Sequence, residues 1–319
     1  ETDGKIPEFD DEPTFARVLK KSHKWAKICG GELVSKINNH INEETYIDFI
    51  QMCETNHNNM LAELGERIEK DIENIKLICI AGPSSSGKTT FSNRLRIELQ
   101  SRNIKPLKIS LDMYYKKREL CPKDEFGNYD FESLYSLDLE LFNEHILALT
   151  RGEEVSLPTF DFETSEITFG PKIKISANTP IIIEGIHALN DKLSYSIPKD
   201  QKFKIFISPQ FQINIDNHNP ISYTDIRLLR RIVRDKEKRG TSAEGTLSMW
   251  PSVRRGEFKW IYPYQEGCNF VFNSALTYEL CVLKKLALPA LKDIDSDSPY
   301  YIQANRLIKF LKHFKDMDP

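Results

Sequence analysis

The chain has 319 residues, of which 40% are apolar and 29% charged, a balance typical of a globular protein rather than a disordered or fibrous one. The net charge is −3, but residues 1–75 carry nine Lys or Arg against 16 Asp or Glu. No strongly basic segment and no run of about 18 apolar residues occurs, so we expect neither a nucleic-acid partner nor a membrane span. The six cysteines form no C-x-x-C pair, which favours reduced thiols and a cytoplasmic location.

Residues 1–75 are predicted to form an acidic helical N-terminal segment. Apolar residues recur there at intervals of three or four, as at Met60, Leu64 and Ile68, which is the spacing of an amphipathic helix. No glycine-rich or catalytic signature falls in the segment, so we interpret it as a small cap or connector. At the other end, residues 293–319 are predicted to hold a C-terminal helix. The sequence leaves open whether this helix packs on the same chain or on a second copy in a homo-oligomer.

Strands and helices are expected to alternate from Lys76 onward. The run Leu-Ile-Cys-Ile-Ala at 77–81 is apolar on both faces, as a buried parallel strand requires. Further strands are expected over 107–111, 155–157, 181–184, 203–207 and 269–272, and helices over 89–101, 138–150, 223–238 and 278–291. This order predicts an α/β fold with a doubly wound parallel sheet. A β-hairpin is expected to project from it, with arms at 167–169 and 173–175 around Gly170-Pro171.

A phosphate-binding loop is predicted directly after the first strand. Residues 82–89 read GPSSSGKT and satisfy the pattern G-x-x-x-x-G-K-[ST], with a helix following at once. The glycines let successive backbone amides turn inward toward phosphate oxygens, and the helix N-terminus adds the positive end of its dipole. Lys88 can reach the β- and γ-phosphates, and Thr89 can ligate Mg²⁺. The candidate ATP-binding residues are Gly82, Ser84, Ser85, Ser86, Gly87, Lys88, Thr89 and Thr90.

Two acids end predicted strands and are candidates for catalysis and metal binding. Asp112 follows the second strand and Glu184 ends the strand at 181–184, and the carboxyl ends of parallel strands line the ligand crevice. Asp112 can accept a proton from an attacking hydroxyl, although an Asp here could also cap a turn. Glu184 is the second candidate for Mg²⁺. His187 follows closely, but a single His is more often structural.

The helix predicted over 223–238 has one apolar face and one basic face. An arc of about 100° holds four arginines, Arg227, Arg230, Arg231 and Arg234. Guanidinium groups match phosphate oxygens, so this helix and the loop at Arg239-Gly240 are interpreted as a helical lid that closes on ATP. The alternative is a solvated basic face neutralised by Asp225, Asp235 and Glu237. The aromatic stretch 250–264 is interpreted as lid packing.

Taken together, the motifs at 82–90, 109–115, 129–131, 157–162, 183–186 and 230–240 resemble the uridine kinase and phosphoribulokinase family of P-loop kinases. The resemblance covers residues 76–292, which would form a P-loop nucleoside kinase domain. It is closest to bacterial-type nucleoside kinases whose kinase domain follows a region similar to threonyl-tRNA synthetase. Residues 1–75 would then be the tail end of such a region.

The resemblance implies a role for each matching residue and implies ATP and Mg²⁺ as cofactors. Asp112 would take the proton from a sugar 5′-hydroxyl, and Asp130 would bind the ribose hydroxyls. Tyr115 would line the nucleoside pocket. Glu184 would serve Mg²⁺, beside Thr89. Arg231 would reach the acceptor side, and Arg234 and Arg239 would neutralise charge on the phosphoryl group.

The chain departs from the family pattern where uridine-cytidine kinases read the base. A Tyr and a His of the family are matched here by Phe160 and Ser165, and Thr241 and Met249 replace an Arg and a Gln further on. A site without these hydrogen-bonding groups discriminates less, so relaxed base preference is expected. The alternatives are a sugar-phosphate kinase of the phosphoribulokinase type and a nucleotide-binding regulatory protein without turnover.

Overall fold

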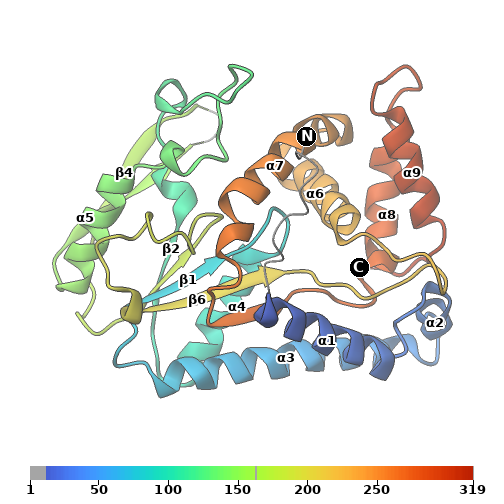
Figure 1. Ribbon diagram of the computed structural model, residues 1–319, viewed down its shortest axis with the longest axis horizontal. Coiled ribbons are helices and arrows are strands. Elements are labelled where there is room, and N and C mark those ends of the chain that lie inside the picture. Colours follow the sequence, from blue (N-terminus) through green and yellow to red (C-terminus); the bar gives the residue numbers. More distant parts are fainter. Residues whose placement is uncertain (1–11, 162–163, 319) are drawn as a thin grey trace, which may run out of the picture.

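A five-stranded parallel sheet forms the centre of the computed structural model, which describes residues 12–161 and 164–318 (Figure 1). The strand order is β2-β5-β1-β6-β7, so the chain crosses from the centre to one edge and then to the other. Their bounds are β1 (Leu77–Ala81), β2 (Leu107–Ser110), β5 (Ile181–Glu184), β6 (Lys202–Ser208) and β7 (Phe270–Asn273). The predicted doubly wound α/β fold is confirmed.

Nine α-helices surround the sheet within the described residues. They are α1 (Pro13–Ile28), α2 (Val34–His40), α3 (Tyr46–Lys70), α4 (Lys88–Ser101), α5 (Leu139–Thr150), α6 (Tyr223–Arg239), α7 (Ala243–Trp260), α8 (Glu279–Lys292) and α9 (Tyr301–Leu311). Helix α5 lies at one end of the molecule, and α8 and α9 lie at the other (Figure 1). None of these helices is long and apolar enough to cross a bilayer.

The unbroken apolar run of β1 follows from burial on both faces of the sheet. Leu77 and Cys79 pack in a cluster that includes Phe142 of α5. Ile78 and Ile80 point the other way, because side chains alternate along a strand, and they pack in a cluster with α3 and α4. Both faces of the strand are therefore covered, as the sequence pattern predicts.

The N-terminal helices share hydrophobic cores with the body of the protein. Leu64 and Ile68 of α3 lie in the same buried cluster as Ile80 of β1 and Leu95 of α4. The start of α3 joins a second cluster formed by α6, α7, α8 and α9. Side chains from both sides of the boundary predicted at residue 75 thus pack in the same hydrophobic clusters. The C-terminal helix packs on the same chain, since Leu307 of α9 is buried in this second cluster.

The predicted hairpin exists, but its arms are different. Strand β4 (Ile167–Ile173) is continuous through Gly170-Pro171, and its antiparallel partner is β3 (Val155–Phe160). The prediction of two short arms around Gly170-Pro171, with 155–157 in the main sheet, was therefore wrong. Pro171 is tolerated because Gly170 and Pro171 lie at the register shift between β3 and β4, where the ladder is interrupted.

Helix α7 is the element that the sequence analysis did not predict. Its interior contains Pro251 and two glycines, which are signals against a helix. Ser242 caps its first turn by accepting a hydrogen bond from the N–H of Gly245 at 3.1 Å. Burial of one face, including Leu247 and Trp250, outweighs the weak helix propensity. Most of the stretch 250–264 thus lies in a helix that packs on α6, the helix interpreted as the lid.

Candidate active site

The loop between β1 and α4 has the shape that a phosphate requires. Gly87 caps α4 with φ 90° and ψ 21°, in the left-handed region that favours glycine, and Ser85 also has a positive φ of 59°. A Cβ on Gly82 would overlap the carbonyl oxygen of Ile207, so only glycine fits there. A Cβ on Gly87 would meet no atom within 4 Å, so this face of the loop is open to a ligand.

The backbone amides of the loop point to an anion as the ligand. Within residues 12–161 and 164–318, the amides of Ser85, Gly87, Lys88 and Thr89 donate no hydrogen bond. Lys88 lies across the loop, where its Nζ donates to the carbonyl oxygens of Gly82 at 2.9 Å and Pro83 at 3.2 Å. Burial lowers the pKa of Lys88, which the nearby carboxylates of Glu184 and Asp112 oppose. Phosphate oxygens would satisfy these donors together.

The structure brings Thr89 and Glu184 together, as the metal-site prediction requires. Thr89 Oγ1 donates to Glu184 Oε1 at 3.2 Å, while Glu184 Oε2 is buried without a hydrogen-bond partner. Burial raises the pKa of Glu184. An unpartnered oxygen beside a hydroxyl fits Mg²⁺, which prefers oxygen ligands and retains phosphates and waters. Across the described part of the chain no three His, Cys, Asp or Glu side chains gather into a metal site, so the ion would depend on the nucleotide for its other ligands.

Strand register explains how Asp112 reaches this edge of the sheet. Glu184 pairs in register with Ser110 of β2 and with Ile80 of β1, so the ends of three strands meet. Asp112 comes two residues after Ser110, in a short 3₁₀ helix. Ser110 caps this helix, because its Oγ accepts a hydrogen bond from the N–H of Asp112 at 3.3 Å. Its side chain is exposed. The charges of Asp112 and Glu184 both act on Lys88, Asp112 from an exposed position and Glu184 from a buried one.

The predicted acceptor residues lie beyond Asp112. The rings of Tyr115 and Phe160 are 5.9 Å apart and tilted by 43°, so the hairpin contributes one wall and the segment after β2 the other. The Tyr115 hydroxyl donates to the carbonyl oxygen of Phe131 at 3.1 Å. Asp130 Oδ1 accepts the N–H of Glu132 at 3.1 Å. Phe162, the last residue of the 157–162 motif, lies outside the described residues.

One buried carboxylate organises the predicted lid arginines. Asp235, which is 1% exposed, accepts from Arg231 Nε at 3.1 Å and Arg234 Nη2 at 2.7 Å, and Arg239 Nη1 lies 3.8 Å away. Arg239 is 54% exposed, so it is free to turn toward a ligand. The second end of Arg231 donates to Ser84 Oγ at 2.7 Å. The structure thus places Arg231 against the phosphate-binding loop.

The other arginines of the stripe are paired with acids from later helices. Arg227 is fully buried against Glu257 of α7. Arg230 Nε donates to Glu279 Oε1 of α8 at 2.6 Å. The basic face is therefore neither solvated nor free of partners, and two of its four members form ion pairs with other helices.

Glu132 is a further acid that the sequence analysis missed. Its side chain packs on Gly256 of α7, where an added Cβ would come within 2.6 Å of the Glu132 Cβ. Burial raises the pKa of Glu132 to about 7, while the charges of Arg231 and Lys88 act in the opposite direction. Its position two residues after Asp130 was a usable signal, since neighbouring residues of a loop reach the same site.

His187, in contrast, has a setting that fits the structural interpretation. Its ring packs edge-on against Trp260, with centroids 5.9 Å apart. Burial lowers the pKa of His187 to about 4, so the imidazole is neutral near pH 7.

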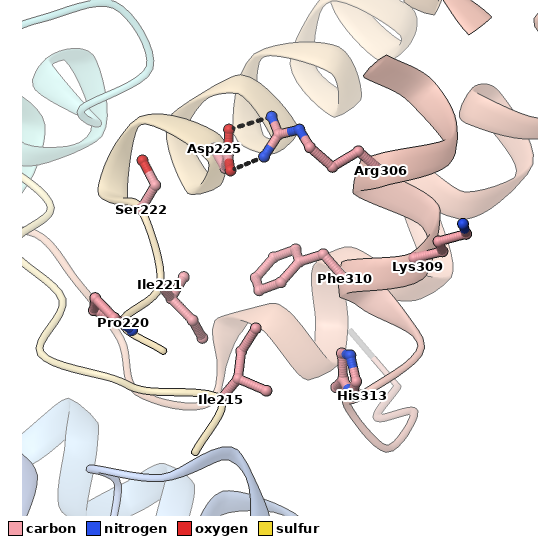
Figure 2. A pocket seen from close by; sticks show the side chains of 9 residues that line it. All are labelled: Ile215, Pro220, Ile221, Ser222, Asp225, Arg306, Lys309, Phe310 and His313. Atoms are coloured by element: carbon pink, nitrogen blue, oxygen red, sulfur yellow. Dashed lines mark hydrogen bonds and ion pairs between the residues drawn. The ribbon is translucent and has the colours of Figure 1, made fainter. Parts of the chain in front are cut away.

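A separate pocket of about 400 Å³ lies between the start of α6 and α9 (Figure 2). The ring of Phe310 points into it toward Ile221, and Arg306 forms two hydrogen bonds with Asp225, at 2.5 and 2.8 Å, on one wall. None of its nine lining residues belongs to the predicted site.

A parallel sheet whose first strand runs into such a loop, with two acids at the ends of neighbouring strands, defines a P-loop nucleotide-binding protein. Residues 77–280 match the model of the "Phosphoribulokinase / Uridine kinase family", and the chain belongs to that family. This assignment makes it a P-loop kinase.

Curated relatives carry a more specific name. A uridine kinase of Staphylococcus aureus strain JH9 is 31% identical over 182 residues, which are 56% of this chain and 77% of that protein. The uridine kinase of strain Newman matches to the same extent. The family match begins at residue 77, so the resemblance of residues 1–75 to a threonyl-tRNA synthetase gains no support.

Two solved structures are similar to the kinase body, each at 18% identity over 66% of this chain. One, provisionally named a fructose transport system kinase from Silicibacter sp. TM1040, is covered to 98% with a TM-score of 0.47. The other, provisionally named a uridine kinase from Bacillus stearothermophilus, is covered fully with a TM-score of 0.37.

Proposed function

We propose that this chain transfers the γ-phosphoryl group of MgATP to the 5′-hydroxyl of a nucleoside. The observation that carries the proposal is the position of Asp112, which is exposed at the sheet edge between the phosphate-binding loop and the Tyr115–Phe160 ring pair. A base lies readily between or against aromatic rings, whereas a sugar phosphate would require cationic groups there. The uridine kinase names of the relatives support the same acceptor class.

Each residue has a distinct part in the proposed transfer. The free loop amides and Lys88 hold the β- and γ-phosphates, and Asp112 accepts the proton as the acceptor hydroxyl attacks. Thr89 and Glu184 would hold Mg²⁺, which neutralises phosphate charge when it is bound. Arg239, with its high exposure, and Arg234 would approach the phosphoryl group when the lid closes. Asp130 would orient the ribose.

Base preference is proposed to be relaxed. The ring of Phe160 offers an apolar face and no hydrogen-bonding group at the position where the family reads the pyrimidine. Ser165, the other departure, has a positive φ of 58° and its N–H donates to the carbonyl oxygen of Asp161 at 2.8 Å, so it is part of a tight turn. A site of this kind distinguishes bases by shape and stacking alone, so the kcat/KM values for nucleosides with different bases should differ little.

A coupled assay of ADP release tests the proposal. The acceptors are uridine, cytidine, inosine, guanosine and ribulose 5-phosphate, with Lys88→Ala as the blank. Turnover with a nucleoside is expected, with kcat/KM values that differ by less than about 100-fold among the bases. A large uridine preference would contradict the relaxed selectivity. Turnover with ribulose 5-phosphate alone would replace the nucleoside proposal with a sugar-phosphate kinase, and MgATP binding without any turnover would favour a regulatory protein.

A further inference from the structure

Every polar group of Ser84, in the phosphate-binding loop, is bonded to a side chain of α6 or α7. Its N–H donates to Glu257 Oε1 at 3.2 Å. Its carbonyl oxygen accepts from Arg227 Nε at 3.1 Å. Its hydroxyl oxygen accepts from Arg231 Nη1 at 2.7 Å. The loop is therefore fixed at this residue by two helices that lie more than 140 positions later in the chain.

The two groups that hold the Ser84 backbone are themselves a buried ion pair. The side chains of Arg227 and Glu257 are both 0% exposed, and they contact each other directly. Arg227 Nη1 also donates to the Tyr262 hydroxyl at 3.0 Å, and Arg254 pairs with the second oxygen of Glu257. Nearly all hydrogen-bonding capacity of the pair is thus used, which is the condition under which a buried ion pair is tolerated.

The Arg227–Glu257 pair also joins α6 to the phosphate-binding loop. Arg227 and Arg231 are four residues apart on α6, so the helix that carries the lid arginines is tied to the loop that binds phosphate. Arg230 of the same helix adds a long contact, 3.4 Å, to the carbonyl oxygen of Ser85. The amides of Ser85, Gly87, Lys88 and Thr89 are left free beside this fixed point. Holding Ser84 from outside keeps the loop curled without using the amides that face the ligand.

We propose that Glu257 is a positioning residue of the phosphate-binding loop, acting through the Ser84 N–H and through Arg227. It touches no reacting atom. By fixing Ser84 it holds the loop in the phosphate-binding shape before nucleotide arrives, so binding does not require ordering of the loop. The inference rests on nucleotide binding by the proposed kinase and not on the identity of the acceptor.

The decisive variant is the double substitution Arg227→Met with Glu257→Leu. Replacing both members of a buried pair with apolar residues of similar volume preserves folding in general, while it removes both contacts to the Ser84 backbone. The single variant Glu257→Gln keeps the size of the side chain and removes its charge. Arg306→Ala is the matched control. It breaks the ion pair between Arg306 of α9 and Asp225 of α6, and Arg306 does not contact the phosphate-binding loop.

Titration calorimetry gives the dissociation constants of MgATP and MgADP, and thermal unfolding gives the Tm of the same samples. We expect the double variant to keep a Tm close to that of the unchanged protein and to bind both nucleotides at least about tenfold more weakly. Glu257→Gln, whose amide oxygen can still accept the Ser84 N–H, should lose less affinity than the double variant. Arg306→Ala should bind normally.

A merely structural pair gives a different pattern. If the double variant bound MgATP within about twofold of the unchanged protein, the proposal would be overturned. Since binding of MgATP and MgADP needs no acceptor, this outcome is independent of the nucleoside assay. If no nucleoside were phosphorylated, the measured affinities for MgATP and MgADP would still test the role of Glu257. If the variants bound these nucleotides normally, the nucleoside proposal would still stand.

Discussion

Asp112 and Glu184 are acids at the same edge of the sheet, but their surroundings differ. The difference favours a role as general base for Asp112 and as metal ligand for Glu184. Glu184 is 4% exposed and bonded to Thr89, whereas Asp112 is exposed and near enough to Tyr115 for its charge to act on that hydroxyl. A general base must reach the proton that it removes, while a metal ligand must be held in place. This contrast, and not sequence position, favours Asp112 as the base.

Replacement of Asp112 by Asn tests that role. The amide keeps the size of the side chain and cannot take a proton, so kcat should fall by about 10² to 10⁴-fold while MgATP affinity changes by less than about threefold. Steady-state kinetics with a saturating nucleoside and calorimetry with MgATP measure the two quantities. Asp216→Asn, an exposed acid of another loop, is the control and should leave kcat unchanged. A near-normal kcat for Asp112→Asn would remove Asp112 as the base.

Glu132 makes the stability of the protein depend on pH. Its pKa is about 7 in the folded protein, against an ordinary value of 4.5, because burial disfavours the charged form. Between these values the unfolded chain loses the proton first, so the folded state loses relative stability as pH rises from about 4.5 to 7. Glu132→Gln should therefore stabilise the protein at pH 8 by about 1–2 kcal/mol and have little effect near pH 4.5.

Urea unfolding of both proteins at several pH values measures this difference. The gain in unfolding free energy should grow as pH rises and level off above pH 7 to 8. Glu125→Gln, an exposed acid of a nearby turn, is the control and should show no such trend. A pH-independent difference for Glu132→Gln would show that the carboxyl group is not held in its neutral form.

At the scale of single elements, predictions succeeded where the signal was local. The phosphate-binding loop and the strands at 77–81 and 181–184 were predicted because each carries its pattern within a few residues. Helix α7 was not, since Pro251 is a signal against a helix, and α7 is stabilised by tertiary contacts with α6 and α8. The missing helix also hid Glu257, so the partner of Arg227 could not be inferred. Residue pairs of this kind depend on tertiary packing, which no short pattern reports.

The left-handed residue at the start of α4 is the local feature on which phosphate binding most depends. Gly87→Ala places a Cβ at φ 90°, which costs about 1–2 kcal/mol in an L-residue, or moves the backbone and turns the amide away. The affinity for MgATP should fall at least about tenfold. Gly127→Ala is a close control, since Gly127 has φ 81° and equally open space but lies in an exposed turn.

Calorimetry with MgATP and thermal unfolding distinguish the two glycine variants. Both should lose similar stability because both carry the same backbone cost. Only Gly87→Ala should lose nucleotide affinity. Equal affinities in the two variants would mean that the amides following Gly87 do not hold the phosphates.

At the scale of the whole molecule, the question is whether residues before 76 form a unit of their own. Leu64 of α3 is fully buried with Ile80 of β1 and Leu95 of α4, so the N-terminal segment and the kinase body share one core. A cap that folded independently would bury such residues among its own helices. We therefore expect the N-terminal helices to unfold together with the kinase body.

Leu64→Ala tests this continuity. Removal of a fully buried leucine side chain should lower the unfolding free energy by about 2–5 kcal/mol, through lost burial and the cavity that remains. The loss should appear in one cooperative urea transition, followed both by circular dichroism and by MgATP binding, because the core of the P-loop body is the one that is damaged. Ile47→Ala, at a position 49% exposed on the same helix, should change stability by less than about 1 kcal/mol. If Leu64→Ala produced a separate early transition with MgATP binding retained through it, the N-terminal segment would be an independent unit and the boundary at residue 75 would be a true domain boundary.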